Sequence, residues 1–497
     1  MMGVKRLAGV ICTLCIFCAD SGFGEEDSED ISFPPNFLLG AATSAYQTEG
    51  AWNVSGKGES IWDRFVHQQP SPITNNATGD VGPDSYNKFQ TDIALLSEIG
   101  FNCYRFSISW SRILPHGFSY KVNKDGIKHY HDVIDKLLAN NIEPIVTLYH
   151  WDLPQVLEDA GGWTNPNIVD WFGDYCKIVF KEYGPKVKKF ITVNEPSQHC
   201  VNAYVTGYHA PGKVSLRGIG EYLCMHHLLK AHARAYRIYE EEFKSTQKGS
   251  IGINLQILPY YPKNNSELSA TELAFQFSVG WILHPIYSEE GDYPEIMKQM
   301  IGKKSKEQGF ARSRLPEFTK EWIDYIRGSS DFLAVNYYTS REVVLNNSYS
   351  SDPSYYDDRG FDESTNPSWK SSASPWLKVY PRGFRDSLNI LADRYGNPHM
   401  YVTENGVSSL EEIDDASRID YFQSHVKEML LAINRDHVNV SGYIAWALLD
   451  SFEWSAGYSR PFGIIHVDFT DPERPRTLKK SACWWKDVIK NQTLSET

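Results

Sequence analysis

The sequence predicts an α/β protein built as a single (β/α)8 TIM barrel with elaborated loops after its strands. Three observations support this prediction. Eight short runs rich in Val, Ile, Tyr and Phe recur along the chain, and stretches with helical periodicity separate them. Of the 497 residues, 41% are apolar, which is enough for one large core. No glycine-rich phosphate-binding loop follows any run, so the alternative, a doubly wound open sheet, lacks its usual signature.

Each predicted strand is a short apolar run bounded by Gly, Pro, Asn or Asp. The fourth run ends at Asn-Glu-Pro and the seventh at Glu-Asn-Gly, which are both turn sequences. In chain order the predicted strands are residues 36–43, 102–110, 143–151, 188–196, 249–257, 331–339, 399–407 and 441–450.

Amphipathic helices are predicted between the strands. In residues 165–185, Asn165 suits the N-cap, Pro166 suits the first helical position, and Gly184 with Pro185 ends the helix. Residues 126–141 show the same periodicity, with one apolar face formed by Ile127, Tyr130, Val133, Ile134, Leu137 and Leu138.

The N-terminus predicts entry into the secretory pathway. Lys5 and Arg6 precede an apolar stretch, Leu7 to Cys18, and small residues follow. We therefore expect a signal peptide at residues 1–24, a short acidic segment at 25–32 and the barrel domain at 33–490. No other apolar run is long enough to span a membrane. A net charge of −13 without a block of Lys and Arg argues against nucleic-acid binding. Oligomeric state is left open.

In a secreted protein, asparagine sequons can be glycosylated and cysteines can form disulfides. Six Asn-X-Ser/Thr sequons are glycosylation candidates, at Asn53, Asn76, Asn264, Asn346, Asn439 and Asn491. Five cysteines remain after the leader, at positions 103, 176, 200, 224 and 483. An odd number does not indicate a disulfide framework. One bridge, Cys200 with Cys224, and a set of buried free thiols are the two alternatives.

Two carboxylates stand at the ends of predicted strands, Glu195 on the fourth and Glu404 on the seventh. In a barrel these ends meet at one mouth, where catalytic groups sit. A pair of carboxyl groups there suits glycoside hydrolysis, in which one protonates the leaving oxygen and the other attacks or activates water. Each neighbouring polar or aromatic residue alone is more simply explained by burial, so the interpretation depends on their joint placement.

Longer motifs strengthen this interpretation. The stretches "FLLGAATSAYQTEGAWNVSGKGESIWDRF", "YRFSISWSRILP", "YHWDLPQ", "TVNEP", "NYYTS", "VTENG" and "WALLDSFEWSAGY" occur in this order. Together they resemble glycoside hydrolase family 1, the β-glucosidase family, from about residue 33 to near residue 485, and they are most similar to animal members, insects included. The resemblance implies a (β/α)8 barrel, no cofactor, no metal, and a small β-glycoside as the partner.

The resemblance also implies roles for individual residues. Glu195 matches the acid/base and Glu404 the nucleophile of a retaining double displacement, with the carboxyl groups about 5 Å apart. Arg105, Tyr338 and Asn336 match supporting residues, the first two favouring an ionised Glu404. Glu195 must begin protonated, so its pKa should be raised by burial and by the Glu404 charge. The substrate-binding residues implied are Gln47, His150, Asn194, Trp446, Glu453, Trp454, Phe462 and, at the aglycone, Trp376.

Several alternatives remain open. Glu453 disfavours a 6-phosphoglycosidase because its charge would repel a phosphate. Ser451 and Pro461 depart from the family pattern, so glucose over galactose or fucose is not fixed. A thioglucosidase similar to myrosinase, or a transglycosidase, would use the same two glutamates. A non-catalytic sugar-binding protein is the alternative of another class, although both glutamates stand in intact motifs.

Overall fold

The computed structural model describes residues 31–264, 267–346 and 350–494. The predicted signal peptide and nearly all of the acidic segment lie outside these residues. Eight parallel strands close into a barrel in the order β1-β13-β12-β7-β5-β4-β3-β2. They are β1 (Leu38–Ala42), β2 (Cys103–Ser107), β3 (Glu143–Tyr149), β4 (Lys189–Val193), β5 (Ser250–Gln256), β7 (Phe332–Tyr337), β12 (Met400–Asn405) and β13 (Val440–Trp446). The predicted barrel is therefore confirmed, and each strand falls within or one residue outside its predicted run.

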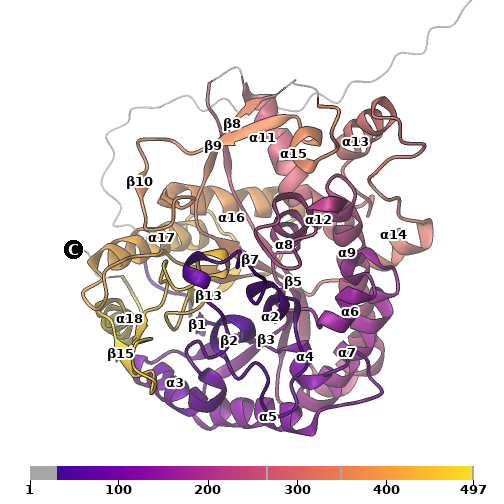
Figure 1. Ribbon diagram of the computed structural model, residues 1–497. Coiled ribbons are helices and arrows are strands. Elements are labelled where there is room, and N and C mark those ends of the chain that lie inside the picture. The colour runs from indigo at the N-terminus through magenta and orange to yellow at the C-terminus, as the bar shows by residue number, and fades with distance from the viewer. Residues whose placement is uncertain (1–30, 265–266, 347–349, 495–497) are drawn as a thin grey trace, which may run out of the picture.

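The barrel strands are covered on their outer side by helices, which surround them in Figure 1. Strands β2, β7 and β12 are buried at every position, as expected for parallel strands packed on both faces. The helices outside the barrel are α3 (Ser85–Ile99), α5 (Lys124–Ala139), α7 (Ile168–Tyr183), α9 (Gly220–Glu242), α12 (Trp281–Tyr287), α13 (Glu295–Glu307), α14 (Lys320–Ile326), α16 (Pro381–Tyr395), α17 (Ala416–Asn434) and α18 (Lys480–Asn491).

Short elements occupy the connections that leave the C-terminal ends of the strands. Figure 1 looks onto this end, with α2 and α8 in front of the barrel. These short helices are α1 (Ala45–Thr48), α2 (Ile61–Val66), η1 (Thr74–Asn76), α4 (Trp110–Ile113), α6 (Gln155–Asp159), η2 (Gly162–Thr164), α8 (Pro196–Val201), η3 (Asn202–Thr206), η4 (Val214–Leu216), α11 (Leu268–Phe275), η6 (Gln276–Gly280), α15 (Tyr355–Asp358) and η7 (Trp454–Ala456), while α10 (Lys244–Gln247) follows α9.

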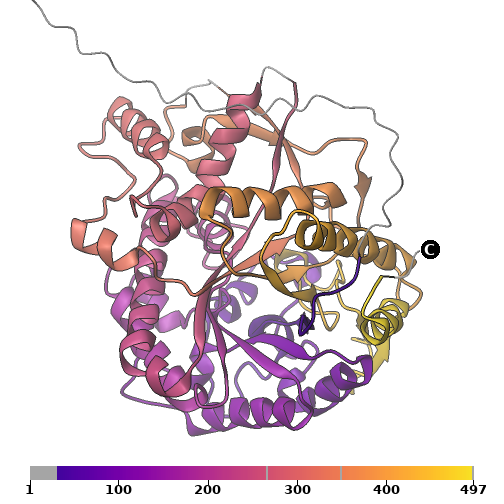
Figure 2. The ribbon, with the colours of Figure 1, turned by 180° about the vertical axis from the view of Figure 1, so that it is seen from behind.

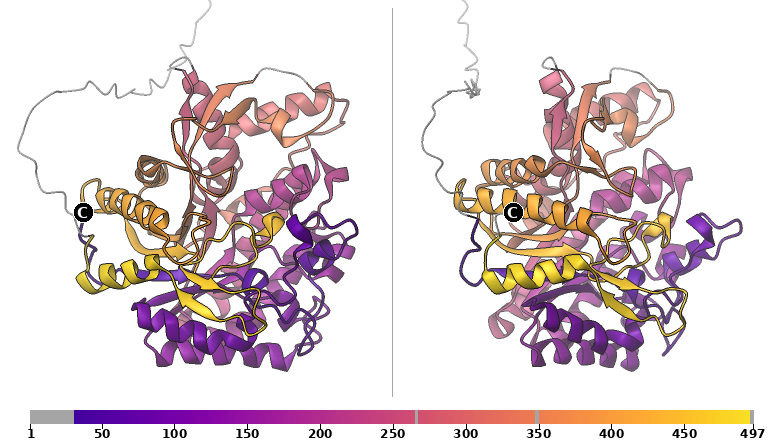
Figure 3. Two further views of the ribbon diagram at one scale, coloured as in Figure 1. Left: turned by 60° about the vertical axis from the view of Figure 1, so that its left-hand side comes forward. Right: turned by 90° about the vertical axis from the view of Figure 1, so that its left-hand side faces the viewer.

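Three small sheets complete the loops. The largest, in the order β6-β8-β9, stands beside the barrel at the top of Figure 3, and the barrel is seen from behind in Figure 2. The extra strands are β6 (Tyr260–Pro262), β8 (Arg341–Leu345), β9 (Phe361–Ser364), β10 (Lys370–Ser371), β11 (Lys378–Val379), β14 (Ile465–Val467) and β15 (Arg476–Leu478). Among the described residues no helix is both long and apolar enough to cross a membrane.

Two details of the helix predictions are wrong. Helix α7 begins at Ile168, after Asn167, rather than at Pro166. The Asn165 side chain instead accepts a hydrogen bond from the Asn167 N–H at 2.9 Å, so it caps a turn before the helix. In α5, Leu138 is 40% exposed because it lies beside the buried face rather than on it.

Of the two alternatives for the cysteines, the structure has the single Cys200–Cys224 bridge. Cys200 on α8 and Cys224 on α9 form a disulfide with their Cα atoms 5.7 Å apart. Cys103 and Cys176 are buried free thiols, and Cys483 is exposed. Five of the six sequon asparagines are exposed; Asn346 is half-buried, and its Nδ2 donates to Asp362 Oδ2 at 2.9 Å.

Candidate active site

Glu195 lies directly beyond β4, where the chain turns into α8. Its φ of +42° is in the left-handed region, which is uncommon for a residue with a side chain. The Glu195 N–H donates to Asn254 Oδ1 at 3.1 Å, and the side chain is 5% exposed. Trp151, just beyond the end of β3, and Trp454, in the loop after β13, also have positive φ angles. Such strained backbone persists only where surrounding contacts hold it, and it is typical of functional sites.

Glu404 lies near the end of β12, where that strand carries a bulge. Val402 pairs with Val335 of β7, but Glu404 pairs with Asn336, so Thr403 is an extra residue. A bulge interrupts the alternation of side chains. Thr403 Oγ1 and the Glu404 carboxylate consequently both reach the site. Gly406 follows and packs directly against β13. A Cβ at this position would lie only 1.8 Å from the Trp446 carbonyl oxygen, so a residue with a side chain would clash.

Arg105 of β2 holds the Glu404 carboxylate from inside the barrel. Its Nη1 donates to Glu404 Oε1 at 2.5 Å, its Nη2 to Asn194 Oδ1 at 2.6 Å, and its Nε to Thr147 Oγ1 at 3.0 Å. Tyr338 O–H donates to the other carboxylate oxygen at 2.6 Å. These bonds fix both oxygens of the Glu404 side chain and place the Arg105 guanidinium directly against it.

The two glutamates belong to one hydrogen-bonded network. Asn336 Nδ2 donates to Glu195 Oε1 at 2.7 Å and reaches Asn194 Oδ1 at 3.3 Å. Asn194 Oδ1 also accepts from Arg105, which binds Glu404. The structure therefore brings together the predicted residues Glu195, Glu404, Arg105, Asn194, Asn336 and Tyr338.

Besides Thr147, which accepts from Arg105, two members of this network were not predicted from the sequence. Asn254 of β5 is fully buried, and its Nδ2 donates to Asn336 Oδ1 at 2.7 Å and to Thr403 Oγ1 at 2.8 Å. Thr403 Oγ1 in turn donates to Asn336 Oδ1 at 2.8 Å. Together they orient the Asn336 amide so that its nitrogen points to Glu195. For Asn254 the available signal was an amide side chain in the middle of the run 249–257.

The two carboxyl groups have opposite environments. Burial and then the negative charge of Glu404 raise the pKa of Glu195 from its usual 4.5 to about 8, against the opposing effects of Asn336 and Arg105. Glu195 is therefore protonated at neutral pH. Glu404 is paired with a guanidinium and a phenol. This is the difference that the two roles require.

The tautomer of His150 follows from the same network. A guanidinium can only donate hydrogen bonds, so the Asn194 side chain must turn its oxygen toward Arg105. The Asn194 nitrogen then faces His150, with Nδ2 3.1 Å from His150 Nε2. His150 Nε2 must then accept, because burial lowers the pKa of this histidine well below its usual value and keeps it neutral. Its proton lies on Nδ1, which has no hydrogen-bond partner among the described residues.

The remaining predicted sugar-binding residues surround this centre. Gln47 Nε2 donates to the Phe452 carbonyl oxygen at 2.8 Å, and Ser451 O–H donates to Glu453 Oε1 at 3.1 Å. Burial, with the charges of Glu404 and Asp450 adding to it, raises the pKa of Glu453 to about 8, so this carboxyl group is largely protonated at neutral pH. The charge repulsion that the sequence suggested against a 6-phosphosugar is therefore weaker than expected. The rings of Trp446 and Trp454 each stack near His150, with centroids 6.0 and 5.9 Å away.

Trp376 and Phe462 flank Tyr338. Their ring centroids lie 5.7 and 6.0 Å from that of Tyr338, both nearly edge-on. Phe462 is 3% exposed, whereas Trp376 is 43% exposed. Trp376 thus lies on the outer side of the residue that binds Glu404, and it is open to solvent.

No group of three His, Cys, Asp or Glu side chains suited to holding a metal ion occurs among the described residues. Two small cavities, of about 40 and 10 Å³, lie beside Glu49. The side chains described at this centre present carboxyl groups, amides, a guanidinium, an imidazole, a phenol and aromatic rings.

Comparison with known proteins agrees with this geometry. The chain is 42% identical over 464 residues to Myrosinase 1 of Brevicoryne brassicae, covering 93% of this chain and 99% of the relative. It is 45% identical over 467 residues to the human lactase-like protein, covering 92% and 82%. These relatives are similar to the chain over nearly its whole described length.

Solved structures give the same result. The structure of aphid myrosinase covers 92% of this chain and 99% of its own, with a TM-score of 0.88 and 42% identity. A rice β-glucosidase variant in a covalent complex with Glc covers 94% and 100%, with a TM-score of 0.87 and 36% identity. The profile described as glycosyl hydrolase family 1 matches residues 29–494. The chain therefore belongs to glycosyl hydrolase family 1.

Proposed function

We propose that this glycoside hydrolase is a retaining β-glucosidase, which removes terminal β-D-glucosyl residues from small glucosides or cello-oligosaccharides. The proposal depends mainly on the contrast between Glu195 and Glu404, whose carboxyl groups belong to one hydrogen-bonded network. Glu195 is buried with its pKa raised to about 8, and Glu404 is held by Arg105 and Tyr338. A protonated acid beside an ionised nucleophile is the starting arrangement for double displacement.

In the first step Glu404 attacks the anomeric carbon of the sugar. The bond from that carbon to the glycosidic oxygen breaks, and the Glu195 proton moves to the departing oxygen. Asn336 Nδ2, 2.7 Å from Glu195 Oε1, keeps the acid oriented through this transfer. The product is a glucosyl ester of Glu404 and a free alcohol.

In the second step water replaces the alcohol. Esterification removes the Glu404 charge, and that charge is the second largest cause of the raised pKa of Glu195. Glu195, now ionised, takes a proton from the water, which attacks the anomeric carbon and releases Glu404. One network of side chains thus lets a single residue act first as acid and then as base.

The sugar would be bound by the polar groups around the pair. His150 Nδ1–H has no partner in the part of the chain that the structure describes, and it can donate to a sugar hydroxyl. Asn194, Gln47 and Glu453 supply further hydrogen-bonding groups, with Trp454 beside them and Trp446 as an apolar face for the ring. Trp376, open to solvent beside Tyr338, would contact the aglycone.

The test is hydrolysis of 4-nitrophenyl β-D-glucoside, galactoside and fucoside by the purified protein and by its Glu404→Gln and Glu195→Gln variants. We expect glucoside hydrolysis that disappears in Glu404→Gln. In Glu195→Gln an activated aryl leaving group should preserve part of the first step and leave the second slow. A folded wild-type protein that hydrolyses none of the three would refute the proposal and favour a sugar-binding role.

Hydrolysis of S-glucosides is a second candidate, supported by the 42% identity to an aphid myrosinase. A thiolate aglycone leaves with less need of protonation, so Glu195→Gln should impair this reaction less than O-glucoside hydrolysis. Measuring kcat/KM on a glucosinolate beside 4-nitrophenyl β-D-glucoside distinguishes the two. Glucosyl transfer to an added alcohol, measured in the same assay, distinguishes a transglycosidase.

We further propose that the protein is secreted and glycosylated. The apolar stretch near the N-terminus, the disulfide and the exposed sequon asparagines support this proposal. Expression in a eukaryotic secretory host should yield protein in the medium that begins near residue 25. Removal of N-glycans by an amidase should lower its mass. Retention of the full N-terminus inside the cell would contradict the proposal.

A further inference from the structure

The segment that carries Glu195 is not stable on its own. Glu195 has a left-handed backbone, and Pro196 directly after it has no N–H to donate. Helix α8 has only six residues, Pro196–Val201, and isolated helices of that length do not form in water. The only backbone bond from the helix to Glu195 among those described runs from His199 N–H to the Glu195 carbonyl oxygen, 3.1 Å. Contacts with other elements must therefore hold this segment.

The front of the segment is held by the end of β3. Trp151 Nε1 donates to the Asn194 carbonyl oxygen at 2.8 Å, and its ring stacks on His199 with centroids 6.4 Å apart. His199 Nε2 lies 3.1 Å from the Tyr149 hydroxyl. These contacts are non-covalent and reach residues 194 and 199, on either side of Glu195.

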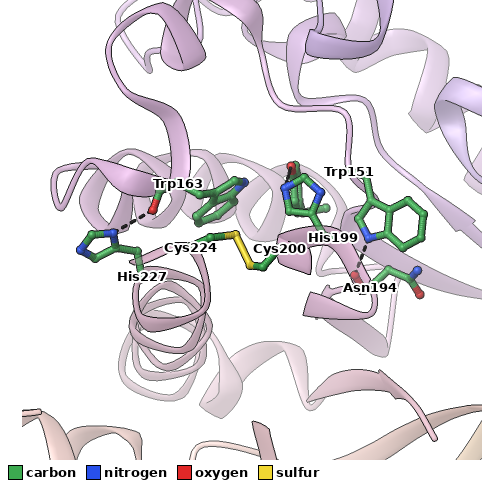
Figure 4. The surroundings of a disulfide bond; sticks show 8 residues. Trp151, Trp163, Asn194, His199, Cys200, Cys224 and His227 are labelled. Atoms are coloured by element: carbon green, nitrogen blue, oxygen red, sulfur yellow. Dashed lines mark hydrogen bonds between the residues drawn. A yellow bond between two sulfur atoms is a disulfide. The ribbon is translucent and has the colours of Figure 1, made fainter. Parts of the chain in front are cut away.

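The far end is held covalently. Figure 4 shows the Cys200–Cys224 bond between the residue after His199 and helix α9. Helix α9 has 23 residues, and one turn beyond Cys224 the His227 Nδ1 bonds the Trp163 carbonyl oxygen at 2.8 Å. Both cysteines are fully buried. The disulfide thus ties a six-residue helix to a long helix that is itself anchored to the neighbouring loop.

We infer that Cys200 and Cys224 are positioning residues for the general acid: their disulfide fixes α8 and thereby the orientation of the Glu195 carboxyl group toward the leaving oxygen. Cys200 lies five residues beyond Glu195 in the chain. The inference depends on the proposed function, because the acid role of Glu195 is part of that function. It predicts that losing the bond impairs proton donation more than sugar binding or nucleophilic attack.

The experiment compares wild type with a Cys200→Ala/Cys224→Ala double variant, which leaves no unpaired thiol. Two substrates separate the roles. Phenyl β-D-glucoside needs its leaving oxygen protonated, and 2,4-dinitrophenyl β-D-glucoside does not. We expect kcat/KM on the phenyl substrate to fall about tenfold or more, since small displacements of a catalytic group are costly, and on the dinitrophenyl substrate less than about twofold.

The matched control is Cys176→Ala, which removes a buried free thiol from α7 and leaves the disulfide intact. It should change neither substrate. Because a loss of folded protein in the double variant would lower both activities, activities are expressed per folded protein, measured by circular dichroism. An equal fall on both substrates in folded double variant, like no fall at all, overturns the inference. If the double alanine variant does not fold, Cys200→Val/Cys224→Ala retains more of the buried volume and is assayed in the same way.

A second readout does not need activity. Amide hydrogen exchange of peptides spanning residues 189–206 should become faster in the double variant and stay unchanged in Cys176→Ala. Unchanged exchange there overturns the inference. Wild-type protein that is inactive on both substrates refutes the proposed function instead, and the exchange experiment then still decides whether the bond holds α8. Alkylation of unreduced, denatured protein must find three free thiols after the leader; five would overturn the inference at once.

Discussion

The protonation state of Glu195 gives a prediction whose size follows from the structure. The pKa of this carboxyl group is raised from 4.5 to about 8, first by burial and then by the charge of Glu404. At pH 7 a group with a pKa of 8 is about nine-tenths protonated, whereas one with a pKa of 4.5 is about 0.3% protonated. The environment of Glu195 therefore increases the fraction of enzyme that holds a usable acid about 300-fold at neutral pH.

The assay is kcat/KM for phenyl β-D-glucoside from pH 5 to pH 10, because this parameter reports the free enzyme and this leaving group needs a proton. We expect activity to fall through a midpoint near pH 8 and then tenfold per pH unit. The Glu195→Gln variant should be much slower and should lack this alkaline limb, since its amide does not titrate. A limb centred near pH 5, or a limb near pH 8 that survives in Glu195→Gln, would refute the reasoning.

Four further predictions follow from single contacts. Tyr338→Phe removes the 2.6 Å bond to Glu404 and should lower kcat/KM on 4-nitrophenyl β-D-glucoside about 10- to 100-fold, the value of a bond to a charged group; an unchanged value would mean that Arg105 alone suffices. Because the folded protein binds the Glu195 proton more tightly than the unfolded chain does, that group stabilises the fold below pH 4.5, and the contribution is lost as pH rises to about 8. The unfolding free energy of Glu195→Gln relative to wild type should therefore be about 3 to 4 kcal/mol higher at pH 8 than at pH 5; equal differences at both pH values would contradict this. Loss of the Cys200–Cys224 bond, which spans 24 residues, should lower the unfolding free energy by about 3 kcal/mol in denaturant titrations, and no loss would indicate that the bond does not form. Trp376→Ala should raise KM for aryl glucosides about two- to tenfold and leave KM for methyl β-D-glucoside unchanged; equal effects on both would place Trp376 outside the aglycone site.

The barrel was predictable because parallel strands buried on both faces appear in the sequence as compact apolar runs. All eight strands were found in this way, and the strand ends then located Glu195 and Glu404. Element boundaries were less predictable. Asn165 and Pro166 form a suitable helix start, yet the chain makes an extra turn and α7 begins at Ile168, because local propensity does not fix where a helix docks on the barrel.

The site was predictable in composition but not in its supporting bonds. The β12 bulge at Thr403 depends on how β12 pairs with β7, which no local sequence signal specifies. The role of Asn254 likewise depends on three strands meeting, since it contacts residues from β7, β12 and the end of β4. The cysteine pairing required the distance between α8 and α9, and spacing alone left free thiols as an equal alternative.

The account depends centrally on a covalent intermediate on Glu404, and trapping that intermediate tests it most directly. A 2-deoxy-2-fluoro-β-D-glucosyl fluoride has a leaving group that needs little protonation and a slow second step, so the ester should accumulate. Mass spectrometry of the inactivated protein should show one added fluoroglucosyl group, and peptide sequencing should place it on Glu404. Inactivation with the label on another residue, or turnover without any label in a protein that hydrolyses glucosides, would contradict the account.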